Sequence, residues 1–188
     1  MKTNIHVWHL EMTDPAKAPT AGQARPYDLQ KVTTPLPELS RFLYITVGGP
    51  WRWYMRADWS WDQWRSWLAR DVIETWVARV DGTPIGYFEL EVQPGQTTEI
   101  LYFGLIPEFI GNGYGKSLLE DAIDRAWRLG GKRVWLHTCT LDHPAALHNY
   151  QARGFRVFKE EDVEDDIPER PIQPWENANK PLPDPLDS

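Results

Sequence analysis

The chain lacks most features that mark secreted or membrane-bound proteins. Cys139 is the single cysteine among 188 residues, so no disulfide can form within the chain. No apolar run approaches the roughly 18 residues that a transmembrane helix needs. Residues 1–6 lack the basic start and long apolar stretch of a secretory signal, and no internal repeat occurs. These absences predict a cytoplasmic protein that does not cross a membrane.

Positive charge is also scarce, because 20 lysines and arginines stand against 27 aspartates and glutamates. The resulting net charge of -7 disfavours contact with phosphate backbones, so no nucleic-acid partner is expected. The same charge would attract a cationic substrate, although solubility alone also explains it. A length of 188 residues suits one domain with a substantial core, as a monomer or a homodimer.

Hydrophobic periodicity predicts strands and helices along most of the chain. The expected strands are residues 5–11, 27–33, 72–80, 84–92, 99–105, 132–138 and 155–159, and the expected helices are residues 37–47, a segment starting at Ser60, residues 113–129 and residues 144–153. Strand and helix alternate from residue 99 to 159, which favours parallel pairing there. Gly104, near the end of a buried strand, is a candidate bulge position.

The composition changes after Lys159. Six acidic residues fall within residues 160–166, and six prolines fall between Pro168 and Pro185. We therefore expect a single domain over residues 1–159 and an acidic, proline-rich tail over residues 160–188. The tail is expected either to lie on the domain through Ile167, Ile172 and Trp175 or to be disordered.

A glycine-rich stretch lies between an expected strand and an expected helix. Residues 109–116 read Phe-Ile-Gly-Asn-Gly-Tyr-Gly-Lys. Glycine permits positive φ and close approach of a ligand, and a helix start offers free N–H donors and the positive end of the dipole. The stretch therefore predicts a phosphate-binding loop. A dinucleotide-binding loop fits the same physics, but that class expects Gly-x-Gly-x-x-Gly spacing and a later acidic residue.

The same stretch resembles a motif of the GNAT superfamily of N-acetyltransferases. Leu105, Ile106 and Pro107 are similar to the Val-x-Pro end of the family's fourth strand. Residues 110–115 are similar to its Arg/Gln-x-x-Gly-x-Gly/Ala loop, with isoleucine in place of the first Arg or Gln. The role of that first position in the family rests largely on its backbone N–H.

A second stretch, residues 143–155, resembles the family's Asn-x-x-Ala-x-x-Leu-Tyr-x-x-x-Gly-Phe. Ala146, Tyr150, Gly154 and Phe155 agree with it. His143 and Asn149 replace the usual Asn and Leu. The resemblance covers roughly residues 72–159, and two motifs at the expected separation are more specific than either alone.

The resemblance implies a fold, a co-substrate and an acceptor. The expected fold is of the α/β (mixed α+β) class, with a mixed, mostly antiparallel sheet of six to seven strands, a splay between strands four and five, and about four flanking helices. Acetyl-CoA is the implied co-substrate, a small-molecule or peptide amine is the implied acceptor, and no metal is expected. The implied cofactor-binding residues are Phe103, Leu105, Ile110, Gly111, Asn112, Gly113, Tyr114, Gly115, Lys116, His143 and Asn149.

Two side chains are candidates for catalysis within the resemblance. Tyr150 occupies the position whose phenol protonates the leaving thiolate, although a tyrosine on a short amphipathic helix can equally be a core residue. Glu99 is similarly placed to the glutamate that deprotonates the amine in the histone-acetylating branch, with Glu89, Glu91 or a water chain as alternatives. The N–H of Phe103 or of Leu105 is expected to bind the acetyl carbonyl oxygen as negative charge develops.

The tryptophan-rich segment over residues 51–67 is the expected wall of the acceptor site, because aromatic faces suit apolar groups and cationic amines. Trp51, Trp53, Tyr54 and Trp59 are the candidates for a pocket. The remaining tryptophans, Trp61, Trp64 and Trp67, are expected to pack the second helix onto the sheet.

The sequence also permits other hypotheses about the site and the function. His137, His143 and His148 lie near Cys139 and Asp142, but their spacing matches no recognised metal-ligand pattern. Cys139 as a nucleophile is a weaker hypothesis, because a lone buried thiol is usually inert and direct attack by the amine needs none. A sensor that binds acyl-CoA without turning it over, or an interaction protein that recruits a partner through its tail, are the alternatives to an enzyme.

Overall fold

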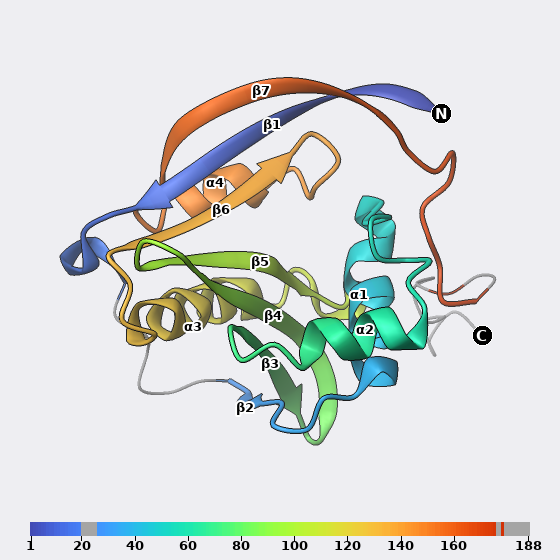
Figure 1. Ribbon diagram of the computed structural model, residues 1–188, viewed down its shortest axis with the longest axis horizontal. Helices are drawn as coiled ribbons and strands as arrows, with labels where there is room; N and C mark the ends of the chain where they lie inside the picture. The colour runs from blue at the N-terminus through green and yellow to red at the C-terminus, as the bar shows by residue number, and fades with distance from the viewer. Residues whose placement is uncertain (20–25, 176–177, 179–188) are drawn as a thin grey trace.

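The computed structural model describes residues 1–19, 26–175 and 178, which form one seven-stranded sheet flanked by four α-helices (Figure 1). The strands are β1 (Lys2–Met12), β2 (Asp28–Lys31), β3 (Ile73–Val80), β4 (Thr83–Gln93), β5 (Thr97–Leu105), β6 (Arg133–Cys139) and β7 (Arg156–Asp166). The α-helices are α1 (Pro37–Gly48), α2 (Trp61–Leu68), α3 (Tyr114–Arg128) and α4 (Ala146–Gln151), and the short 3-10 helices are η1 (Pro15–Lys17), η2 (Gly49–Trp51) and η3 (Pro107–Phe109). No helix in this described part of the chain is long and apolar enough to cross a membrane.

The sheet has the order β2-β3-β4-β5-β6-β1-β7, and its neighbouring strands are antiparallel except for β5 and β6. Those two are parallel, and they pair only from Thr97 opposite Arg133 to Glu99 opposite Trp135. Beyond this point they diverge, as the ribbon shows (Figure 1). The predicted mixed, mostly antiparallel sheet with a splay between its central strands is therefore confirmed.

Two details of the sheet differ from the expectation. The strands β6 and β7 do not pair in parallel, because β1 lies between them and is antiparallel to both. The bulge in β5 is at Leu101, which is the extra residue in the pairing with β4, whereas Gly104 stands in regular register opposite Tyr87. A Cβ on Gly104 would lie 2.6 Å from Cγ1 of Val47, so this glycine allows α1 to approach the sheet closely.

The last strand is longer than predicted. It continues past Lys159 to Asp166, so the acidic run belongs to an edge strand whose partner β1 supplies cations. Lys2 pairs with Glu164 at 3.0 Å, and His6 contacts two further carboxylates of β7. After the strand, Ile167 is buried and the N–H of Ile172 donates to Gly49, whereas Trp175 is exposed. The acidic residues that were expected to begin the tail therefore belong to an edge strand, and their counter-ions lie on the neighbouring strand β1.

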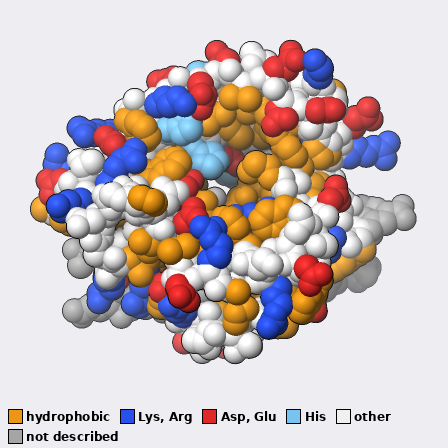
Figure 2. Space-filling view, in the orientation of Figure 1, with side chains coloured by type: hydrophobic (Ala, Val, Ile, Leu, Met, Phe, Trp, Pro, Cys, Tyr) orange, Lys and Arg blue, Asp and Glu red, His pale blue; other side chains and the backbone are white. Residues whose placement is uncertain are grey.

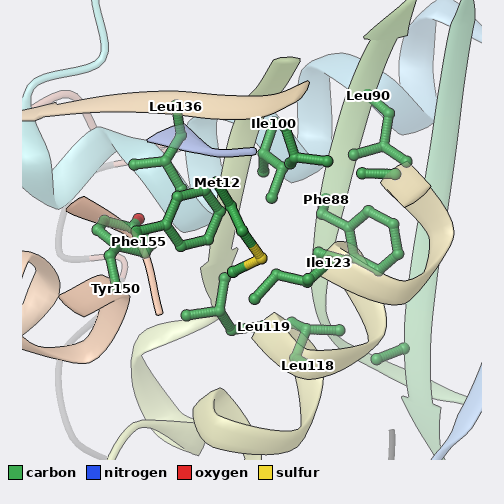
Figure 3. Packing of buried hydrophobic residues seen from close by; sticks show 14 of the residues in the cluster. Met12, Phe88, Leu90, Ile100, Leu118, Leu119, Ile123, Leu136, Tyr150 and Phe155 are labelled. Carbon is green, nitrogen blue, oxygen red and sulfur yellow. The ribbon is translucent and has the colours of Figure 1, made fainter. Parts of the chain in front are cut away.

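Alternating side chains place one core on each face of the sheet. On β3 and β4, Ala78 and Phe88 face the apolar stripe of α3, and Val77 and Tyr87 face α1. The larger core contains the α3 residues Leu118, Leu119, Ala122, Ile123 and Ala126. Figure 3 shows Tyr150 and Phe155 at one end of this cluster, beside Leu136 and Leu119. Packing of these two side chains in the core thus fixes the position of α4 and of Tyr150 on it.

Helix α2 begins as predicted at the N-cap Ser60, which forms a capping box with Gln63. Its tryptophans do not all pack inward. Trp64 is buried, but Trp61 is half exposed and donates from its indole to Glu38. Because Trp61 lies on the outer side of the short helix, the expectation that it packs on the sheet is wrong.

Candidate active site

A cavity of about 630 Å³ opens where β5 and β6 diverge. Its walls come from these two strands, the glycine-rich loop, α4, the segment after η2, and the outer strands β1 and β7. Figure 2 shows a hollow on this face, with histidine side chains at one edge and hydrophobic side chains around it. Distant parts of the sequence therefore meet in one site.

Most predicted site residues line this cavity. They are Tyr150, Phe103, Leu105, Ile110, Gly111, Gly113, Gly115, Lys116, His143, Asn149, Trp51, Trp53 and Tyr54. The predicted residues that are not among the lining residues are Glu99, Asn112, Tyr114 and Trp59. Of these, Tyr114 packs with Phe109 and Tyr27 on the core side.

The glycine-rich loop has the conformation that its sequence predicts. Gly111 and Gly113 have φ of 90° and 83°, and a Cβ at either would meet only open space. Gly113 is the N-cap of α3 and makes no side-chain cap, so the first N–H groups of the helix are left for a ligand. Lys116 adds a cation at the same end of the cavity. These features fit a phosphate group that approaches the backbone closely.

Ile110 differs from the rest of the loop. Its N–H donates to the carbonyl of Pro107 at 3.1 Å, which closes the short helix η3. The backbone donor that the family resemblance would assign to this position is therefore engaged within the chain. The backbone N–H donors that remain for a ligand belong to the residues that follow Ile110 in the loop.

Tyr150 lies at the junction of the cavity and the core. Its side chain is 8% exposed, and its ring contacts Phe103 and Phe155 edge-on. Burial, and secondarily the charge of Asp142, raises the pKa of the Tyr150 phenol well above its ordinary value. The phenol is therefore held in its protonated form at neutral pH, beside the gap between the strands.

Backbone N–H groups of β5 point into the gap between β5 and β6. The N–H of Ile106, just after β5, donates to the carbonyl of Ile85 on β4 at 2.9 Å. Because N–H groups alternate in direction along a strand, those of Leu105 and Phe103 point away from β4 and toward the divergent β6. Both residues line the cavity, and the binding of a carbonyl oxygen by their N–H groups stays a prediction.

Glu99 lies behind the cavity wall, where β5 and β6 still pair. Its residue is 4% exposed, and its carboxylate accepts a hydrogen bond from Nε2 of Gln93 at 2.6 Å. The other carboxylate oxygen is 3.4 Å from Nδ1 of His137. The side chain of His137 is 40% exposed and lines the cavity. The hydrogen bond with Glu99 raises the pKa of the imidazole above its ordinary value.

The two alternative carboxylates on β4 are engaged elsewhere. Glu91 pairs with Arg70, and neither glutamate is among the residues that line the cavity. Glu89 is buried in an ion pair with Arg56, whose guanidinium is 2.8 Å from its carboxylate. Of the three candidate glutamates, Glu99 is the one that contacts a histidine lining the cavity.

Arg56 explains the position of Trp59. The guanidinium is 4.8 Å from the ring centroid of Trp59, 4.0 Å from that of Trp67 and 4.6 Å from that of Tyr102. The indole of Trp67 also donates to Glu89 at 3.0 Å. This aromatic cluster does bind a cation, as aromatic faces do, but the cation is an arginine of the chain itself. Trp59 therefore contacts this internal guanidinium and is not among the residues that line the cavity.

Several lining residues carry no signal that the sequence motifs could have revealed. Ile5 and Val7 of β1 and Val163 of β7 line the cavity together with Trp53 and Tyr54. Only the alternation of Ile5 and Val7 indicates that they share one face of a strand. The sequence suggests His137 only as a metal-ligand candidate, whereas the strand register places it two residues beyond Trp135, the last β6 residue that pairs with β5.

Cys139 also lines the cavity, but its thiol is a weak nucleophile. Burial raises the pKa of its thiol to about 11, with a further contribution from Asp142. The thiol therefore stays protonated at neutral pH, and a protonated thiol is a poor nucleophile.

A mixed sheet that splays beside a glycine-rich helix start is an α/β arrangement with room for a phosphate-bearing ligand between two strands. The sequence model of the Acetyltransferase (GNAT) family matches residues 36–155, which is more than half of the chain. The chain belongs to this family, as the two motifs indicated.

Individual relatives agree with this assignment. Over 82 residues the chain is 29% identical to S-alkylcysteine N-acetyltransferase of Bacillus subtilis (strain 168), covering 43% of this chain and 46% of that protein. A GCN5-related N-acetyltransferase from Sphaerobacter thermophilus has a TM-score of 0.63 at 17% identity, covering 92% of this chain and 54% of that one. A Bacillus subtilis acetyltransferase in complex with CoA has a TM-score of 0.55 at 24% identity, covering 71% of this chain and 78% of that one. The chain spans about half the length of the first two, and the structural likenesses show the fold.

Proposed function

We propose that this protein transfers an acetyl group from acetyl-CoA to the primary amine of a small molecule or peptide. The observation that carries the proposal is the convergence on one cavity of the open glycine-rich helix start, the gap between β5 and β6, and Tyr150. Membership in the GNAT family and the CoA complex of a structural neighbour support it.

The chain's own groups have distinct tasks in this proposal. The free N–H groups at the start of α3 and Lys116 bind the pyrophosphate, with His143 and Asn149 on the wall beside it. The N–H groups of Phe103 and Leu105 bind the acetyl oxygen, where the loss of one such donor typically costs about 3 kcal/mol of transition-state stabilisation. Acetyl-CoA supplies the activated acyl group as a thioester.

The proton and electron balance involves two side chains. The amine nitrogen forms a bond to the acetyl carbon as the carbon–sulfur bond breaks, and Tyr150 donates its proton to the departing thiolate. The nitrogen loses two protons between ammonium and amide: one goes to the base before attack, and the one lost after attack restores the Tyr150 phenol. The proton of the amine must leave before or during the attack, because only the free amine is nucleophilic. Glu99 is the carboxylate toward which that proton moves, although it acts from behind the cavity wall.

The acceptor end of the cavity favours an amine attached to an apolar group. Its walls contain Trp53, Tyr54, Ile5 and Val7, which suit aliphatic or aromatic substituents. Asp142 is a carboxylate at this end, and its Oδ1 is 3.4 Å from the indole nitrogen of Trp53. The relative from Bacillus subtilis is named for S-alkylcysteine, a compound that carries both an amine and an alkyl thioether. A substrate of that kind is compatible with such a wall.

The test combines calorimetry with a thiol-release assay. We expect CoA to bind the wild-type protein, and a panel of alkylamines, arylalkylamines, polyamines, amino-acid amides and S-alkylcysteines to include acceptors that release free CoA. A Tyr150→Phe variant should keep its affinity for CoA and lose thiol release with the best acceptor. Absence of CoA binding would refute the proposal, and binding without transfer to any amine would favour the sensor.

A further inference from the structure

The imidazole of His137 connects a buried carboxylate to the cavity. Residue 137 is two positions beyond Trp135, the last residue of β6 that pairs with β5, so it lies where the gap begins. Its Nδ1 faces Glu99 at 3.4 Å, and its partly exposed side chain lines the cavity. The imidazole is thus placed between the carboxylate and the space for the reacting groups.

A chain of hydrogen bonds fixes the carboxylate of Glu99. The indole nitrogen of Trp135 donates to Oε1 of Gln93 at 3.0 Å, which leaves the amide nitrogen of Gln93 to donate to Glu99 at 2.6 Å. One oxygen of Glu99 is therefore occupied and the other faces His137. A carboxylate held in this way selects the imidazole tautomer with the proton on Nδ1, so Nε2 is free to accept a proton.

We propose that Nε2 of His137 accepts the proton of the acceptor amine, as a catalytic residue, and that Glu99 is a positioning residue that orients the ring. This inference rests on the proposed function. It moves the proton acceptor from a buried carboxylate to a group that faces the cavity. The proton passes from the ammonium nitrogen to Nε2, the imidazolium is stabilised by the Glu99 charge, and the proton then leaves to solvent past the exposed edge of the ring.

The neighbours of His137 are consistent with this role. Glu99 faces it from β5, Asp142 contributes a more distant negative charge, and His9 of β1 has its ring centroid 6.0 Å away. His9 is itself bonded to Glu161 at 2.7 Å and is not among the cavity-lining residues. Both carboxylates favour the imidazolium, so the acid limb of kcat/KM should report the raised pKa of His137.

The experiment compares His137→Gln, Glu99→Gln and the control His9→Gln, with the best amine of the panel. We expect His137→Gln to lower kcat by about 10²-fold or more and to remove the acid limb, with CoA affinity unchanged. Glu99→Gln should lower the rate less and move the limb to lower pH, because the imidazolium loses its stabilising charge. His9→Gln should keep the wild-type profile.

Ring-proton NMR of the histidines adds a readout that does not depend on turnover. The pKa of His137 should fall toward its ordinary value in Glu99→Gln, and a pKa that does not move would overturn the pairing. If the wild-type protein transfers acetyl groups and His137→Gln matches it within threefold, only the role of His137 fails. If the wild-type protein transfers none, the proposed function fails first.

Discussion

Replacing Arg56 by methionine tests the internal ion pair at the centre of the tryptophan-rich segment. Arg56 is 5% exposed and Glu89 is 2% exposed, so the substitution leaves a buried carboxylate with the indole of Trp67 as its described donor. Breaking a buried pair from one side costs about 3–5 kcal/mol. Contact of the guanidinium with several aromatic rings adds up to about 2 kcal/mol when desolvated, part of which the methionine thioether restores.

The assay is urea unfolding followed by tryptophan fluorescence, with a thermal scan beside it. For a chain of this size, loss of the ion pair alone should lower the midpoint temperature of Arg56→Met by roughly 6–20 °C. The double variant Arg56→Met with Glu89→Gln should regain about 2 kcal/mol, because a neutral amide can still accept from Trp67 and no charge remains buried.

Two results would refute this reasoning. One is an Arg56→Met protein whose free energy of unfolding lies within about 1 kcal/mol of wild type, which would mean that the pair is not energetically coupled to the fold. The other is a double variant that is less stable than the single one. Either result would remove Arg56 as the reason that the tryptophan-rich segment keeps its shape.

Three further predictions concern the loop, a helix cap and pH. Gly113→Ala and its control Gly82→Ala both place a side chain at positive φ in open space, so each should lose about 1–2 kcal/mol of stability, but only Gly113→Ala should weaken CoA binding in calorimetry. Ser60→Ala should cost about 1 kcal/mol in urea unfolding, since the capping box with Gln63 is lost; no change would show that α2 does not depend on its cap. Hydrogen bonds with two β7 carboxylates raise the pKa of His6, so its stabilisation is present below the unfolded pKa and is lost as pH rises through the folded one. The wild type should therefore exceed His6→Gln in midpoint temperature of unfolding by more at pH 5.5 than at pH 8.5. An equal difference at the two pH values would contradict this.

Local patterns were sufficient for most elements of the fold. The capping box at Ser60, the hairpin turn at Gly82 and the helix start after Gly113 each have a chemical signal within a few residues. The two GNAT-like motifs were recognisable for the same reason, because each is contiguous in the chain. Such signals depend on backbone geometry that one short segment determines alone.

Relations between distant segments were not predictable in the same way. Nothing in residues 2–12 shows that they lie between β6 and β7, because a strand's neighbours depend on packing rather than on its own composition. The acidic composition of β7 suggested a solvated tail, whereas Lys2 and His6, which pair with three of its carboxylates, come from the other end of the chain. Trp59 was expected to face a ligand, and the guanidinium that it contacts was not recognisable as its partner from spacing.

The insertion of β1 between β6 and β7 has a consequence for synthesis. Val7 sits opposite both Cys139 and Glu161, so the first strand acquires its second neighbour only when more than 150 further residues have been made. Contacts of such long separation form slowly, because closing the intervening loop costs entropy before any pairing rewards it. Until then the part of the cavity wall that β1 and β7 form is missing, and a nascent chain that already contains the glycine-rich loop and α3 has an incomplete cavity.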